Sequence, residues 1–101
     1  MKFDLKDMSD QRIKNVCDDW DDEFDGMPLT TGVFVFVDAQ HDVKYVGWAL
    51  DGHLKSAAEK AYNEGRGKGA TLVGWARCFN SEKSKTLADD WIKKYGPPNN
   101  K

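Results

Sequence analysis

Two strand-like segments separated by a very short connection constrain this chain more than any other feature. Residues 31–38 read Thr-Gly-Val-Phe-Val-Phe-Val-Asp, and so many β-branched and aromatic residues are typical of a strand buried on both faces. Residues 43–49 form a second strand-like segment after a short turn at 39–41. Because a parallel crossover needs about a dozen residues, the two strands are predicted to be antiparallel neighbours.

A helix is predicted after this hairpin. Asp51 can cap its first turn, since Asp is a preferred N-cap residue. Apolar residues then recur at three- and four-residue steps and form one face of the helix: Leu54, Ala57, Ala58, Ala61 and Tyr62. Three glycines within residues 65–69 end the helix. We expect its apolar face to pack against the sheet.

A third strand and a last helix complete the C-terminal part. Residues 70–79 supply the strand, and Asn80 or Ser81 can cap the helix that follows. The helix ends at Gly96, before two prolines. Its predicted apolar face consists of Leu87, Ala88, Trp91, Ile92 and Tyr95.

The N-terminal segment predicts a further helix with an acidic end. Ser9 or Asp10 can cap it, and its apolar stripe consists of Ile13, Val16, Cys17, Trp20 and Phe24. Residues 1–25 hold nine acidic and four basic side chains, a net charge of −5, whereas the rest holds eight acidic and eleven basic ones, a net charge of +3. The acidic run at 18–25 is either a solvated helix end or linker, or an arm that repels nucleic acid or covers a basic face of the domain.

The expected fold class is therefore α+β, with the element order α-β-β-α-β-α. A three-stranded mixed or antiparallel sheet, built from the hairpin and the third strand, is flanked by helices because each amphipathic element needs an apolar surface to cover. We divide the 101 residues into an acidic helix and linker at 1–28, packed on or beside the domain, and the domain itself at 29–101.

Composition excludes several classes of protein. No apolar run approaches the length of about 18 residues needed to span a bilayer, and the N-terminus lacks the apolar core of a signal peptide. We therefore expect a cytoplasmic protein that does not enter a membrane. Cys17 and Cys78 show no metal-ligand spacing, so we expect two ordinary thiols and no zinc site.

The hairpin, the later elements and the tail together resemble the GIY-YIG nuclease domain. Residues 32–34 and 45–47, Gly-Val-Phe and Tyr-Val-Gly, match its two tripeptides, and residues 91–100 match its proline-rich end with an asparagine. The resemblance spans residues 31–100. It implies a chemistry in which tyrosines orient or activate water, an arginine binds phosphate and a glutamate holds one divalent metal ion.

The residues that this resemblance assigns to the chemistry are largely absent. Phe34 replaces the first tyrosine and lacks its hydroxyl. Ala57 matches the position of the arginine and Ala88 that of the glutamate, while Tyr45 and Asn100 are retained. The resemblance therefore implies a catalytically degenerate domain with a vestigial site, for which we expect no catalytic residue, no metal and no cofactor.

A divergent metal-dependent DNA endonuclease is the alternative. Tyr45 keeps its hydroxyl, although it is equally well explained as a strand aromatic. Lys55 or Arg66 could contact a phosphate, but Lys55 lacks a bidentate fork and lies about 200° around the helix from Ala57. A shifted alignment would make Asp89 the ligand of a divalent cation such as Mg²⁺, although it lies about 100° from the Ala88 face of the helix.

The remaining residues suit a binding or interaction module for a protein partner or nucleic acid. Arg66 and Lys68 are predicted to contact phosphate through charge and backbone N–H groups, or else belong to an ordinary glycine turn. Trp48 and Lys55 are further candidates. Trp48 and Trp75 could stack a base if exposed, or fill the core. The net charge of −2 favours a binding module over a nuclease.

Overall fold

A computed structural model describes residues 1–16, 30–50 and 52–100 of the chain. The helices and strands are η1 (Leu5–Ser9), β1 (Ile13–Val16), β2 (Gly32–Val37), β3 (Val43–Ala49), α1 (Leu54–Asn63), β4 (Leu72–Cys78), α2 (Ser81–Tyr95) and η2 (Pro98–Asn100), where η1 and η2 are 3-10 helices. No helix among the described residues is both long and apolar enough to cross a membrane.

Four strands form one antiparallel sheet in the order β1-β4-β2-β3. The hairpin of β2 and β3 and the later strand β4 agree closely with the predicted bounds. The predicted three-stranded sheet is wrong, because β1 adds a fourth strand along β4. Without β1, the edge of β4 would present a row of unpaired backbone N–H and C=O groups.

The predicted N-terminal helix is wrong over Ile13–Val16, which form β1. Ile13 pairs with Cys78 and Val16 with Ala76, so these β-branched residues lie in a strand ladder and not on a helical stripe. Asp10 does not cap a helix at this point; its carboxylate accepts hydrogen bonds from Arg12. The rest of the predicted stripe, at positions 17, 20 and 24, and the acidic run at 18–25 lie outside the described residues.

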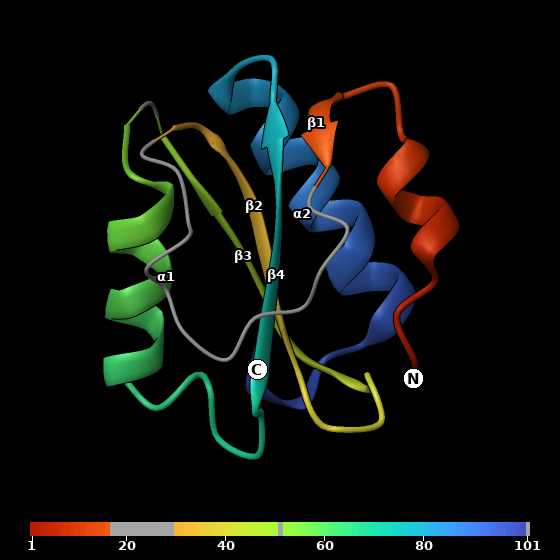
Figure 1. Cartoon of the computed structure of the whole chain (residues 1–101), viewed down its shortest axis with the longest axis vertical. Coiled ribbons are helices and arrows are strands. Elements are labelled where there is room, and N and C mark those ends of the chain that lie inside the picture. The colour runs from red at the N-terminus through yellow and green to blue at the C-terminus, as the bar shows by residue number, and fades with distance from the viewer. Residues whose placement is uncertain (17–29, 51, 101) are drawn as a thin grey trace.

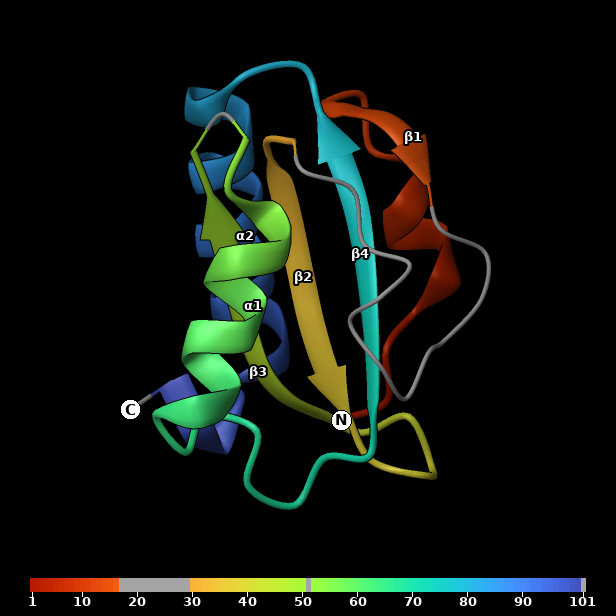
Figure 2. The ribbon, with the colours of Figure 1, turned by 60° about the vertical axis from the view of Figure 1, so that its left-hand side comes forward.

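The sheet separates two apolar layers, which we call the α1 face and the α2 face. Figure 1 shows the sheet nearly edge-on with α1 on one side and α2 on the other, and in Figure 2 α1 comes to the front of the sheet while α2 lies behind it. As predicted, β2 is buried along its whole length. Val33, Val35 and Val37 belong to the core of the α2 face, whereas Phe34 and Phe36 belong to that of the α1 face.

Both ends of α2 follow the predicted signals. The Asn80 side chain accepts a hydrogen bond of 2.8 Å from the backbone N–H of Lys83, and Gly96 ends the helix with a φ of 53°. The helix α1 begins at Leu54. Its predicted cap, Asp51, lies outside the described residues.

Residues 1–16 cross the α2 face, and we call them the N-terminal strap. At one end, Phe3 N–H donates to the carbonyl of His41, and Val43 N–H, at the start of β3, donates to that of Met1, each at 2.9 Å. At the other end, β1 pairs with β4. Between these ends the Phe3 ring packs against Trp91 and Tyr95 of α2, with centroids 5.2 and 5.4 Å away. The strap therefore connects the two edges of the sheet across α2.

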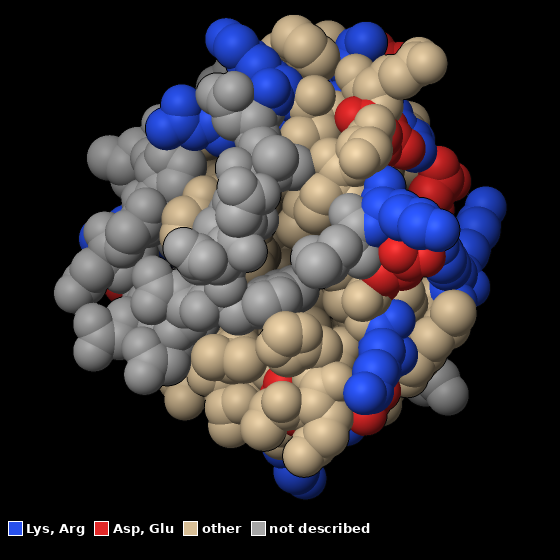
Figure 3. All heavy atoms as spheres, turned by 45° about the vertical axis from the view of Figure 1, so that its right-hand side comes forward, with Lys and Arg blue, Asp and Glu red and all other residues tan. Residues whose placement is uncertain are grey.

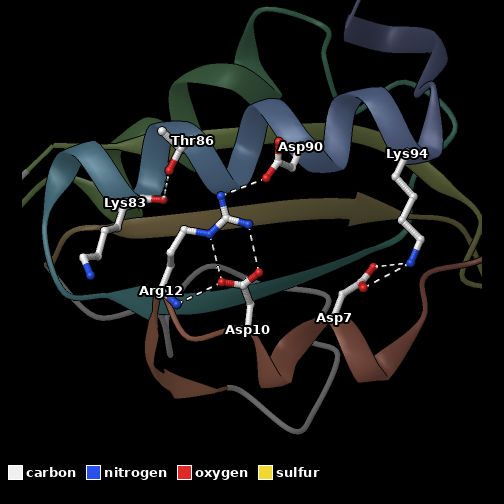
Figure 4. Close-up of polar contacts among 7 residues, drawn as sticks. All are labelled: Asp7, Asp10, Arg12, Lys83, Thr86, Asp90 and Lys94. Atoms are coloured by element: carbon white, nitrogen blue, oxygen red, sulfur yellow. Dashed lines mark hydrogen bonds and ion pairs between the residues drawn. The ribbon is translucent and has the colours of Figure 1, made fainter.

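Ion pairs attach the strap to α2 (Figure 4). Lys94 Nζ donates to both carboxylate oxygens of Asp7, at 3.0 and 3.1 Å. Arg12 donates to Asp10 through Nε and Nη2, at 2.9 and 2.8 Å, and its Nη1 lies 2.8 Å from Asp90 Oδ2. Basic and acidic side chains consequently lie next to one another along this side of the molecule (Figure 3).

Acid should weaken the strap. Hydrogen bonds from the Arg12 side chain hold the pKa of Asp10 below its usual range, although partial burial opposes them. A carboxylate with a lowered folded-state pKa stabilises the fold above its unfolded pKa of about 4, and this stability is lost as the pH falls through the folded value.

Asp10→Asn should therefore lower the free energy of unfolding by about 1 kcal/mol at pH 6 and reduce its decline below about pH 4. Urea denaturation at a series of pH values, followed by tryptophan fluorescence, measures both effects. Asp89→Asn, at an exposed position of α2, is the control and should leave the profile unchanged. Equal profiles for Asp10→Asn and the unmodified chain would contradict this role of Asp10.

Candidate functional site

The two matched tripeptides lie opposite each other on β2 and β3. Phe34 pairs with Gly47, and a Cβ atom added at Gly47 would lie only 2.2 Å from Phe34 Cζ. The phenyl ring therefore occupies the space that a side chain at position 47 would need. Gly32 is required for a similar reason, since its added Cβ would lie 2.2 Å from the carbonyl oxygen of Ala76 on β4. With 2% of its surface exposed, Phe34 is a core residue.

Tyr45 lies half-buried on the α1 face, in an aromatic cluster with Phe34 and Phe36. Its ring centroid lies 6.0 and 5.9 Å from theirs. The cation beside this ring is Arg66, whose guanidinium carbon lies 5.8 Å from the ring centre. Lys55 is half-buried on α1 and has no side-chain partner among the described residues. Of Lys55 and Arg66, the two cations of the nuclease alternative, the structure thus places Arg66 next to Tyr45.

The two alanines that the resemblance matches to an arginine and a glutamate lie on opposite faces of the sheet. Ala57 is half-buried and packs against the core of the α1 face. Ala88 is completely buried in the core of the α2 face, together with Leu87 and Trp91. These two positions consequently do not line one common concave surface beside Tyr45.

The two carboxylates next to Ala88 are exposed on α2. Asp90 is 58% exposed and bound to Arg12 of the strap, and Asp89 is exposed on the same helix. In the part of the chain that the structure describes, no group of three His, Cys, Asp or Glu side chains could hold a metal ion. Burial raises the pKa of the Cys78 thiol, which disfavours the thiolate that binds metals. Position 88 therefore supplies no carboxylate for the divalent cation that the resemblance implies.

The retained Asn100 stabilises the outer edge of the sheet. Its Oδ1 accepts from the N–H of Val46 at 2.8 Å, and its Nδ2 donates to the carbonyl of Val46 at 2.9 Å. The strand β3 lies at the edge of the sheet, so these two backbone groups would otherwise face away from any strand. The tail asparagine is thus a structural residue of the hairpin.

The preceding residue, Asn99, fixes the glycine loop. Its Nδ2 donates to the carbonyl groups of Arg66 and Lys68, at 2.7 and 2.9 Å. In return, Arg66 Nη1 donates to the carbonyl of Asn99 at 3.0 Å. The backbone N–H groups of Gly65, Arg66 and Lys68 already donate to carbonyls within residues 61–65, at 3.0 to 3.3 Å. A phosphate at this loop would therefore contact the side chains of Arg66 and Lys68, not these predicted backbone groups.

The two candidate tryptophans are both half-buried and face opposite sides of the sheet. Trp48 packs against the core of the α2 face and Trp75 against that of the α1 face. Each is therefore partly a core residue.

Two residues that the structure brings to the glycine loop were not predicted from the sequence as site residues. Asn99 was identified only as part of the tail, and Tyr62 as part of the apolar face of α1. Tyr62 is 53% exposed, and a Cβ added at Gly67 would lie 2.6 Å from its Cδ2 atom. The sequence signal for this contact was the glycine at position 67, because only a residue without a side chain lets the Tyr62 ring approach so closely.

Comparison with solved structures identifies the fold. The GIY-YIG N-terminal endonuclease domain of UvrC from Thermotoga maritima, bound to its catalytic magnesium, matches with a TM-score of 0.61 and 23% identity, over 73% of this chain and 86% of that chain. Two tyrosine-to-phenylalanine point mutants of that domain, each bound to the catalytic divalent cation, match over the same shares with TM-scores of 0.60 and identities of 25% and 22%. No protein-family model and no curated protein sequence matches the chain. The chain thus has the GIY-YIG fold, as the resemblance implied, with four strands in its sheet.

Proposed function

We propose that this chain is a non-catalytic binding module on a GIY-YIG scaffold, with nucleic acid or a protein as its partner. The observation that carries the proposal is the complete burial of Ala88 in the core of the α2 face. A carboxylate that holds a catalytic cation must be accessible to the cation and the substrate, and position 88 offers neither. Phe34, closed over Gly47, likewise supplies no hydroxyl to a reaction.

A divergent endonuclease is the second candidate, because Tyr45 retains its hydroxyl and has the Arg66 guanidinium beside its ring. It would need Tyr45, Lys55 or Arg66 and Asp89 to act on one phosphodiester with a divalent cation. Tyr45 lies on the α1 face, whereas Asp89 is an exposed residue of α2, the helix that covers the other face. This separation favours the binding module.

A cleavage assay separates the two candidates. The full chain is incubated with plasmid, branched and single-stranded DNA in Mg²⁺ or Mn²⁺, with EDTA as the blank. We expect no products above the blank at any metal concentration. The matched variants are Tyr45→Phe and Asp89→Ala, which remove the two groups that the nuclease alternative needs. Metal-dependent cleavage that either variant abolishes would contradict the proposed function.

A further inference from the structure

We propose that the corner where the glycine loop meets the tail binds a nucleotide unit of single-stranded nucleic acid. This loop–tail corner consists of Tyr45, Tyr62, Arg66, Lys68 and Asn99. Arg66 and Lys68 would hold the phosphate, and the exposed face of Tyr62 would stack the base. The inference rests on the proposed function in one respect only, namely that the nucleic acid is bound and not cut.

The corner is held in place before any ligand arrives. Asn99 bonds to the carbonyls of both cationic residues, and Arg66 returns a bond to the Asn99 carbonyl. The neighbouring Asn100 attaches the same tail to Val46 of β3. Figure 2 shows the tail and the loop after α1 together at the lower end of the molecule. A cation that is already positioned loses less conformational entropy on binding than a free side chain does.

Within the described part of the chain, neither cation of the corner is paired with a carboxylate. Among the described residues, three cationic side chains form ion pairs: Arg12 with Asp10 and Asp90, Lys44 with Asp38 and Lys94 with Asp7. Arg66 and Lys68 form no ion pair with any described carboxylate.

A guanidinium has five N–H donors, and the carbonyl of Asn99 accepts a bond from Arg66 Nη1 alone. No described carboxylate pairs with the other donors of Arg66 or with the ammonium group of Lys68, so an anion could bind there. Phosphate suits them, because a guanidinium binds its oxygens in a bidentate manner and a nearby ammonium adds a second positive charge.

An exposed aromatic ring beside these cations points to a nucleotide and not to phosphate alone. Tyr62 packs against Gly67, the residue between Arg66 and Lys68. Its ring lies edge-on to that of Phe36, with the ring centroids 6.3 Å apart. With 53% of its surface exposed, the tyrosine offers a platform for a base. Aromatic platforms next to basic side chains are typical of proteins that bind single strands, whose bases are free to leave the stack.

The net charge of −2 predicts that such binding is weak. The affinity should also fall with salt, because phosphate contacts release counterions. The test uses the full chain in EDTA, with a fluorescein-labelled 20-nucleotide single strand of thymidylate as the probe. Anisotropy is measured at about 20 mM and about 150 mM salt, where the screening lengths differ by a factor of about two to three. A duplex of the same length and inorganic phosphate are the comparison ligands.

Four variants locate the site. At low salt, Arg66→Ala and Lys68→Ala should each weaken binding of the single strand at least about fivefold, because each removes a cation that holds the phosphate. Tyr62→Leu should weaken binding about fivefold or more, because it removes the stacking platform. The lost stacking energy is largely independent of salt. Lys85→Ala is the matched control: it removes one exposed lysine of α2 on the other face and should change affinity less than about twofold. Circular dichroism melting of each variant verifies that it is folded.

The outcomes distinguish this inference from the proposed function. Absence of single-strand binding at low salt, equal binding of the duplex, or equal effects of Arg66→Ala and Lys85→Ala would overturn the inference and leave a protein partner for the module. NMR shifts of the Arg66 and Lys68 amides with inorganic phosphate but not with the single strand would overturn it as well. Metal-dependent cleavage, in contrast, would contradict the proposed function and leave the loop–tail corner as a substrate contact.

Discussion

Ala88→Glu, which restores the carboxylate that the GIY-YIG resemblance implies, should destabilise this chain by about 3 kcal/mol or more at pH 7. Ala88 is completely buried on the α2 face among Leu87, Trp91 and Val46 of the same core. The longer side chain must displace these neighbours and bury a carboxylate within an apolar core. The substitution is therefore expected to cost stability without creating metal binding.

The pH dependence identifies the cause of this loss. Burial would raise the pKa of the introduced carboxyl group above its unfolded value of about 4.3, so the destabilisation should be smallest below that pH and grow as the pH rises towards 7. Urea denaturation at pH 4 and pH 7 measures the difference. Thr86→Glu introduces the same side chain at an exposed position of α2 and should cost less than about 0.5 kcal/mol at either pH.

A stable Ala88→Glu variant that also gains a Mg²⁺-dependent shift of its melting temperature would contradict this account. It would show that position 88 can reach solvent and hold a cation. A single substitution at position 88 would then restore cation binding. The burial of Ala88 would no longer argue against catalysis.

The elements from β2 to α2 could be predicted because their signals are local. The buried run at 31–38 and the three- and four-residue steps of the two helices each depend on neighbouring residues only. The strand β1 could not be predicted in this way. Ile13 and Val16 are three residues apart, which is also a helical step, and what makes them a strand is pairing with Cys78 and Ala76 of β4. Tertiary pairing outweighed the local pattern.

The sequence predicted the basic residues of the candidate site but not the contacts that bring them together. Arg66 and Lys68 were identified from the glycines around them, but their connection to Asn99 joins residues 31 to 33 positions apart. Tyr62 was assigned to the core from its helical spacing, whereas it lies at the end of α1, where the chain turns back over Gly67. Contacts made by such a turn depend on loop geometry, which residue periodicity does not contain.

The residues that match the GIY-YIG pattern and those that depart from it make different kinds of contact. The side chains that maintain the hairpin and the tail, which include Phe34 and Asn100, make close contacts with Gly47 and with the backbone of Val46. Positions 57 and 88, in contrast, are occupied by small apolar residues that only fill space. Close packing explains Gly47 and backbone hydrogen bonding explains Asn100, two residues that match the GIY-YIG pattern, without reference to catalysis.

Gly47→Ala provides the direct test of this packing interpretation and should destabilise the chain by about 2 kcal/mol. Its added methyl group would lie 2.2 Å from Cζ and 2.7 Å from both Cε atoms of Phe34, a ring that is only 2% exposed. Phe34→Leu removes all three of these ring atoms. In that background the same Gly47→Ala substitution should be neutral or stabilising, because alanine has less backbone freedom to lose than glycine in a strand.

Urea denaturation of the unmodified chain, the two single variants and the double variant gives this coupling as a double-mutant cycle. We expect a favourable coupling energy of about 2 kcal/mol, although Phe34→Leu alone costs about 1 kcal/mol through lost packing. Equal costs of Gly47→Ala in both backgrounds would mean that the ring and the glycine are independent. The Gly-Val-Phe and Tyr-Val-Gly pair would then need an explanation other than packing, and a role for position 34 in chemistry would have to be considered again.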